Sequence, residues 1–258
     1  MSLVYLTKGI EFAAAHRYLR EEWDEARNRE VFGACYNAPG HGHNYFLDVT
    51  VAGHIDPATG MVVNLYDLKI VLKAVLEEFD HKHLNLDTPY FKDTVPTMEN
   101  IARVLWRLLE RHRNIGTLHK VQLAEDEDLR ATVTGSQGLD RASISRRYGV
   151  RTDVPSLSSR TGRDGRGYDD ELWVTVEGPI DAKTGMVIDL RHLDRVIHDH
   201  VLTTLPNAVL ELRRRERAGT GEEVTRFVWD SIASHLHGAR LEQIKIIESR
   251  DLAYACAG

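Results

Sequence analysis

The sequence has only two cysteines, Cys35 and Cys256, too few for a disulfide framework, which favours a reducing compartment such as the cytoplasm. It has no apolar run long enough to cross a bilayer, and its first residues lack the regions of a signal peptide. It also has no excess of basic residues, since 33 Lys and Arg stand against 39 Asp and Glu. The net charge of -6 gives no indication of a nucleic-acid surface. We therefore expect a cytoplasmic chain with no nucleic-acid or membrane partner.

An internal repeat divides the 258 residues into two related halves. Residues 53–68, GHIDPATGMVVNLYDL, return at 178–193 as GPIDAKTGMVIDLRHL. Further matches join 97–106 to 220–229 and 125–129 to 248–252. The pattern breaks near residues 135–139 at a Ser-Gln-Gly sequence, which is typical of a linker. The repeat predicts a first unit of residues 1–137 and a second of 138–258.

Each half is predicted to contain the same succession of elements. In the first half, strands are expected at about 3–17, 43–53, 118–125 and 129–134, and helices at about 65–79 and 98–112. In the second half, the matching strands and first helix are expected at about 141–149, 170–178 and 190–204. Two strands, two helices and two more strands form a four-stranded antiparallel sheet with two helices on one face. The predicted fold class is therefore α+β.

The stretch from Cys35 to Tyr45 contains the most reactive side chains of the first half. His41 and His43 stand two apart at the start of an alternating run, and side chains two apart on a strand point to the same face. His16 ends the preceding strand-like run and is the third expected ligand. Three neutral imidazoles leave one position open, as in catalytic zinc sites. Cys35 is then either a fourth ligand or a reactive thiolate beside the metal.

The second half lacks these groups. Arg166 and Tyr168 correspond to the two strand histidines, and we expect Arg146 to correspond to His16. No metal site is therefore predicted in this half. Glu248 matches a glutamate of the first half, and it is either vestigial or directed at the site of a neighbouring chain.

The motifs of the first half resemble those of the 6-pyruvoyl-tetrahydropterin synthase family, here in a fused two-copy form. They are, in chain order, Phe12 to His16, Cys35 followed after five residues by His41-Gly42-His43-Asn44, Gly60 to Asn64, Asp80-His81-Lys82, Pro96 to Asn100, and Glu125. The second half matches only in its scaffold elements. The resemblance implies the tunnel fold, in which six such units join as two stacked trimeric barrels. It therefore implies a homotrimer of two-unit chains with at most three zinc sites.

The resemblance also implies a role for each residue of the site. The zinc ligands would be His16, His41 and His43. Cys35 would be the general base that removes a proton from the substrate side chain, and Asp80 with His81 would relay that proton and orient the base. Glu125 would anchor the pterin ring by accepting hydrogen bonds from its N–H groups. The backbone near Thr97 and Glu99 would assist in substrate binding.

Three functions follow from the resemblance. The first is a carbon–oxygen lyase that converts 7,8-dihydroneopterin triphosphate to 6-pyruvoyl-tetrahydropterin with loss of triphosphate and without a redox cofactor. The gap of five residues between Cys35 and His41 favours this branch. The second is the related 6-carboxy-tetrahydropterin synthase of deazapurine and queuosine synthesis. The third, suggested by the second half without metal ligands, is a non-catalytic pterin-binding protein.

Overall fold

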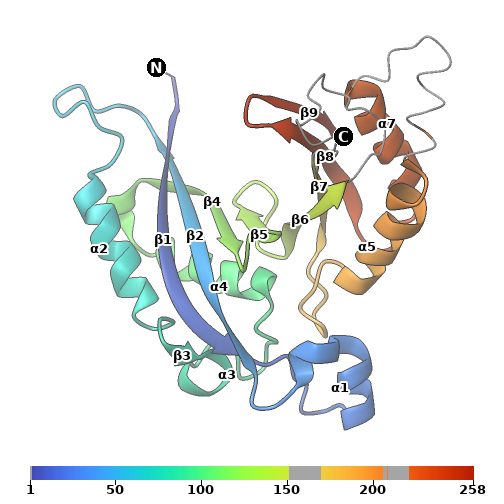
Figure 1. Ribbon diagram of the computed structural model, residues 1–258. Coiled ribbons are helices and arrows are strands. Elements are labelled where there is room, and N and C mark those ends of the chain that lie inside the picture. The colour runs from blue at the N-terminus through green and yellow to red at the C-terminus, as the bar shows by residue number, and fades with distance from the viewer. Residues whose placement is uncertain (1, 151–169, 206–207, 209–220) are drawn as a thin grey trace, which may run out of the picture. The chain divides into compact units, whose positions relative to one another are not determined.

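The computed structural model describes residues 2–150, 170–205, 208 and 221–258 (Figure 1). The chain forms two compact units. The first unit contains Met1–Ala142 together with Pro179–Met186, and the second contains Ser143–Gly178 together with Val187–Gly258. The segment Pro179–Met186 thus belongs to the second repeat by sequence but packs within the first unit.

The first unit is built on an antiparallel sheet in the order β1-β2-β4-β5, with a short parallel strand on its outer edge. The strands are β1 (Val4–His16), β2 (His41–Gly53), β3 (Lys82–His83), β4 (Thr117–Ala124) and β5 (Leu129–Thr134). β1 and β2 pair over their whole length, so that His16 lies opposite His41. The pairing brings the predicted ligands of two strands together at one end of the sheet.

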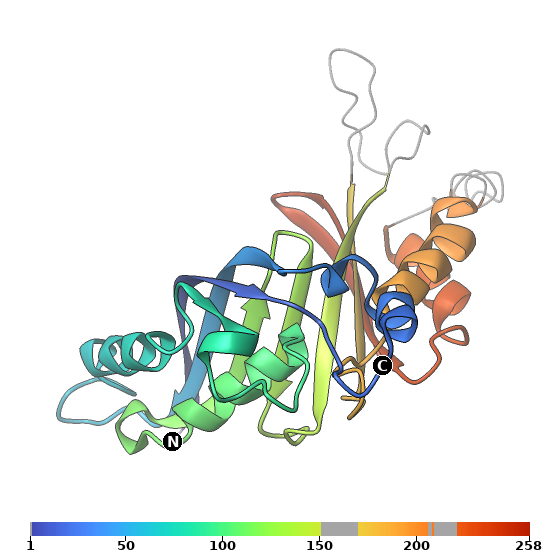
Figure 2. The same ribbon diagram turned by 90° about the horizontal axis from the view of Figure 1, so that it is seen from below.

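Two long helices, α2 (Leu65–Leu76) and α4 (Met98–Leu109), cover one face of this sheet (Figure 2). Each begins at a side chain that caps its first turn. Asn64 accepts a hydrogen bond from the Tyr66 N–H, and Thr97 accepts one from the Asn100 N–H. Shorter helical segments complete the unit: α1 (Glu25–Phe32), α3 (Leu84–Asp87) and the 3-10 turns Gly33–Tyr36 and Arg113–Ile115. The core between sheet and helices is largely apolar, with side chains such as Leu47, Leu68, Leu105 and Leu123 at 0% exposure.

The second unit repeats this plan. Its strands follow the order β6-β7-β8-β9, and they are β6 (Arg141–Val150), β7 (Asp170–Pro179), β8 (Arg240–Ser249) and β9 (Leu252–Ala257). Its helices are α5 (Leu190–Ile197), which continues into a π-helical turn at His198–Leu202, and α7 (Gly221–Ile232). The bulge between Thr50 and Val51 recurs between Thr175 and Val176. The predicted α+β class is confirmed. No helix among the described residues is both long enough and apolar enough to cross a membrane.

The register of β6 corrects one expectation from the sequence. Ser145 Oγ lies 2.9 Å from Thr175 Oγ1, as Thr7 Oγ1 lies 2.8 Å from Thr50 Oγ1 in the first unit. Because residues 50 and 175 are equivalent in the repeat, Ser145 is equivalent to Thr7. The expectation that Arg146 matches His16 is therefore wrong. The matching position, like the counterparts of His41 and His43, lies outside the described residues.

Candidate metal and thiol site

Four side chains of the first unit bring their donor atoms within 4.8 Å of one another: His16, His41, His43 and Glu125. His16 and His41 face each other across the β1–β2 pair, and His43 lies two residues further along β2 on the same face. Glu125 directly follows β4, whose last residue, Ala124, pairs with β2. The sheet register alone therefore gathers the three predicted histidines and adds a carboxylate.

The donor atoms lie slightly closer together than the ligands of a bound zinc ion would. His16 Nε2 lies 3.1 Å from His41 Nε2, and His43 Nε2 lies 2.8 Å from Glu125 Oε1. In a tetrahedral zinc site with bonds of about 2.0–2.2 Å, neighbouring donors stand roughly 3.3–3.5 Å apart. The His43 nitrogen is buried and forms no aligned hydrogen bond within the described residues, although the carboxylate is so near. His43 Nε2 and Glu125 Oε1 are therefore placed where both could bind the same cation.

His16 is held in the form that binds a metal. Its Nδ1 lies 3.0 Å from the carbonyl oxygen of Pro96, so Nδ1 carries the proton and Nε2 offers its lone pair to the cluster. The ring is completely buried. Burial, followed by the neighbouring charges of His41 and His43, lowers the pKa of His16 from 6.5 to about 3. Burial and His43 also lower the pKa of His41. His16 and His41 are therefore neutral at physiological pH, as metal ligation requires.

Cys35 lies in the 3-10 turn Gly33–Tyr36, and its half-buried side chain packs against an apolar cluster of Tyr18, Phe32 and Val95. The Tyr18 N–H donates to the Cys35 carbonyl oxygen over 2.9 Å. The Tyr18 ring in turn contacts the His16 ring, with centroids 5.0 Å apart. The apolar cluster thus links the thiol segment to the histidines.

Two buried tyrosines, Tyr18 and Tyr45, are influenced by both Glu125 and Cys35, and no sequence motif pointed to either. Burial first, and then Glu125, raises the pKa of Tyr18 and of Tyr45 well above the ordinary value, and Cys35 contributes at both. Both phenols therefore stay protonated. Cys35 and Glu125 thus both act on the pKa values of the same two phenols.

Asp80 and His81 lie at the outer edge of β1. The Ala13 N–H donates to Asp80 Oδ1 over 2.9 Å, the His81 N–H donates to the Ala13 carbonyl oxygen over 2.6 Å, and His81 Nδ1 lies 3.0 Å from Asp80 Oδ2. The Ala13 N–H, more than the His81 ring, lowers the pKa of Asp80. His81 has a φ of 58° and its ring is 83% exposed. The β1 edge thus fixes the backbone of this pair and leaves the imidazole in the open.

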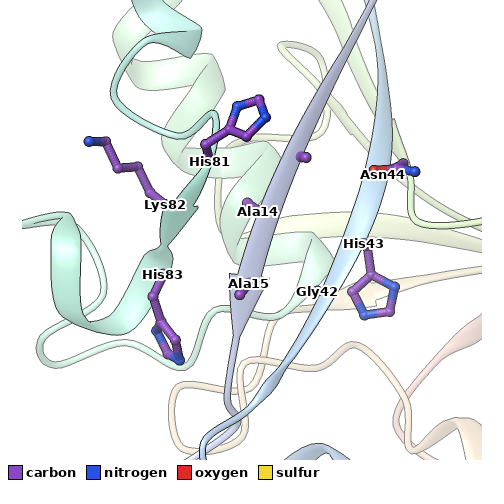
Figure 3. A pocket seen from close by; sticks show the side chains of 9 residues that line it. Ala14, Ala15, Gly42, His43, Asn44, His81, Lys82 and His83 are labelled. Carbon is purple, nitrogen blue, oxygen red and sulfur yellow. The ribbon is translucent and has the colours of Figure 1, made fainter.

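An open pocket of ≈ 440 Å³ lies along this edge. His81, Lys82 and His83 line it beside β1, and His43 and Asn44 line it from β2 (Figure 3). Small residues, Ala13 to Ala15 and Gly42, form the rest of its wall. The His43 ring points away from the His81 side in Figure 3, so His81 is not one of the clustered ligands.

Thr97 and Glu99, expected near the substrate, are buried at the start of α4, with 1% and 5% exposure. The Thr97 hydroxyl donates to the Gly185 carbonyl oxygen over 2.6 Å, so a turn of the second repeat already occupies it. Substrate binding by these two residues stays a prediction. The repeat in the sequence predicts that the turn at Gly185 is equivalent to the turn at Gly60. It does not predict that the turn at Gly185 packs against Thr97.

Comparison with known proteins places both halves in one group. The sequence model of a family described as 6-pyruvoyl tetrahydropterin synthase matches residues 5–136 and 162–258. The human 6-pyruvoyl tetrahydrobiopterin synthase is 44% identical over 124 residues, which cover 48% of this chain and 86% of the human protein. A putative 6-carboxy-5,6,7,8-tetrahydropterin synthase of Archaeoglobus fulgidus is 34% identical over 105 residues, 38% of this chain and 84% of that protein.

A solved structure supports the same assignment. The Caenorhabditis elegans 6-pyruvoyl tetrahydropterin synthase structure superimposes with a TM-score of 0.51 at 39% identity. It covers 52% of this chain and 97% of that one, so one two-unit chain corresponds to about two such proteins.

Proposed function

Because the chain belongs to the 6-pyruvoyl tetrahydropterin synthase family, a family of lyase enzymes, we propose that it converts 7,8-dihydroneopterin triphosphate to 6-pyruvoyl-tetrahydropterin with loss of triphosphate. The observation that supports this most strongly is the cluster of three imidazoles and a carboxylate, which Tyr18 links to the segment of Cys35. The 44% identity to the human synthase over 124 residues favours the same branch.

We propose that the metal is Zn²⁺ and that His16, His41 and His43 hold it. Nitrogen donors in this number, with one further position for substrate oxygens, suit zinc. When bound, the ion would polarise hydroxyl oxygens of the substrate side chain and so acidify the neighbouring C–H. The donor set fits, since Nε2 of His16 is freed for ligation by the bond from Nδ1 to Pro96.

Glu125 has a carboxylate that can serve the substrate as well as the cluster. Its Oε1 lies beside His43, and the group is 13% exposed. A substrate whose side chain reaches the histidines would place its ring near this carboxylate, which can accept two hydrogen bonds from the pterin amino and ring N–H groups. The role of Glu125 as the pterin anchor is part of the proposal.

We propose that Cys35 removes the C–H proton and that Asp80 and His81 relay it. Asp80 can hold His81 in one orientation because their side chains are 3.0 Å apart. The exposed His81 ring is available to a second copy of the chain, which agrees with a homotrimer whose sites lie between copies. The proposed compartment is the cytoplasm.

The test is product analysis by mass spectrometry after the zinc-loaded protein receives 7,8-dihydroneopterin triphosphate, with Cys35→Ala alongside. A 6-pyruvoyl product with released triphosphate supports the proposal. A 6-carboxy product with acetaldehyde supports the second candidate, which the Archaeoglobus relative favours. Pterin bound without turnover would favour a binding protein and overturn both.

A further inference from the structure

The turn of the second repeat at residues 181–186, which we name the docking turn, is internally rigid. The Asp181 N–H donates to the Met186 carbonyl oxygen over 3.0 Å, and the Gly185 N–H donates to the Asp181 carbonyl oxygen over 2.8 Å. The Asp181 carboxylate accepts the N–H groups of Lys183 and Thr184 over 3.0 and 2.7 Å. The turn therefore presents its last two residues in a fixed arrangement.

Gly185 is seated on the first turn of α4. Its carbonyl oxygen accepts the Thr97 hydroxyl over 2.6 Å, and its φ of +77° suits glycine. A Cβ at this position would come within 2.5 Å of Asn100 Nδ2 and 3.1 Å of Thr97 Cγ2. Asn100 cannot easily yield, because the same Nδ2 donates to the Val95 carbonyl oxygen over 2.8 Å. The contact has no room for a side chain.

Met186 follows directly and packs against the apolar cluster of Tyr18, Phe32 and Val95, the cluster against which Cys35 also packs. The docking turn therefore supplies part of the apolar surroundings of the segment that carries the thiol. Within the cluster, Cys35 is tied to Tyr18 by a backbone hydrogen bond of 2.9 Å.

The first repeat contains the same turn without the contact. At residues 56–61, the Asp56 N–H donates to the Met61 carbonyl oxygen over 2.9 Å, and the Gly60 N–H to the Asp56 carbonyl oxygen over 2.8 Å. Gly60 has a φ of +70°, yet a Cβ there would meet nothing within 4 Å, and Met61 is 44% exposed. The turn at residues 56–61 thus adopts the same hydrogen bonds without a contact like that of Gly185 with α4. The contact of the docking turn with α4 is therefore not needed to form the turn.

We propose that the second repeat, whose described residues hold no cluster of metal ligands, positions the Cys35 thiol through the docking turn, with Gly185 and Met186 as positioning residues. This inference rests on the proposed role of Cys35. Gly185 fixes the start of α4 and Met186 supports the apolar cluster behind the thiol. The second repeat thus contributes to the site of the first.

The test compares Gly185→Ala with Gly60→Ala, and Met186→Ala with Met61→Ala, in the full-length protein. Each control introduces the same backbone strain or removes the same side chain where the docking contact is absent. Three quantities are measured: zinc per chain, the rate and pH profile of Cys35 alkylation by iodoacetamide from peptide mass spectrometry, and kcat with KM. Met186→Leu serves as the conservative variant.

We expect Gly185→Ala and Met186→Ala to retain zinc, to shift the Cys35 alkylation rate at least about threefold, and to lower kcat about tenfold with little change in KM. Met186→Leu should have the alkylation rate and the kcat of the unsubstituted protein, and so should the controls Gly60→Ala and Met61→Ala. Alkylation and kcat equal to the controls would overturn the inference. If the unsubstituted protein has no turnover but the alkylation difference persists, the proposed reaction fails and the positioning role stands.

Discussion

In metal-free protein, stability should fall as the medium is acidified, and His16 is the main cause. Complete burial and the flanking His41 and His43 lower its pKa from 6.5 to about 3. Unfolding restores the ordinary pKa, so the unfolded chain binds a proton first as the pH falls. The folded state is therefore disfavoured progressively below pH 6.5, and the loss continues until the pH approaches 3.

The magnitude follows from the two pKa values of this one group. Between pH 7 and pH 5 the unfolded chain becomes almost fully protonated at His16 while the folded chain stays neutral there, and integrating this difference lowers the free energy of unfolding by about 2 kcal/mol. Urea titrations followed by circular dichroism at pH 7, 6 and 5, in the presence of a chelator, measure this loss directly.

His16→Gln should remove most of this pH dependence, because the amide does not titrate. His54→Gln is the matched control, since His54 is exposed and should leave the loss between pH 7 and 5 unchanged. If all three proteins lose stability in parallel, the neutral, desolvated state assigned to His16 is wrong.

Three further results are expected. Glu125→Gln should weaken zinc binding about tenfold or more in competition with a chromogenic chelator, because the carboxylate lies 2.8 Å from the His43 nitrogen; unchanged affinity would separate Glu125 from the metal. Cys35→Ala should keep its zinc while turnover falls about 10²- to 10⁴-fold, and normal turnover would exclude the thiol as the base. Thr97→Val should lower the free energy of unfolding by about 1–2 kcal/mol in urea, because it removes the helix cap and the bond to Gly185; equal stability would contradict that contact.

The sequence could predict the strands and the clustering of the three histidines because both depend on local periodicity, whereas their binding of zinc stays a prediction. Two-residue alternation places His41 and His43 on one face, and the run that ends at His16 pairs with theirs from end to end. The α+β class followed from the order of elements.

The rest depends on contacts that local sequence does not encode. Glu125 joins the histidines only through the β2–β4 register, which pairs Phe46 with Ala124. The helix expected to reach residue 79 ends at Leu76, since the chain turns there to bring the His81 N–H to the β1 edge. The helix α1 is polar and has no apolar stripe from which the sequence could predict it. Arg146 was wrongly matched to His16 because the strand register of β6 cannot be read from the sequence.

The most direct test of the central claim, that the first half alone holds a metal-dependent site, is the zinc content of protein purified without chelators. Plasma mass spectrometry with an independent protein assay should find one zinc per chain, and none after His43→Ala. Two zinc ions per chain, or one that survives the loss of His43, would contradict the account.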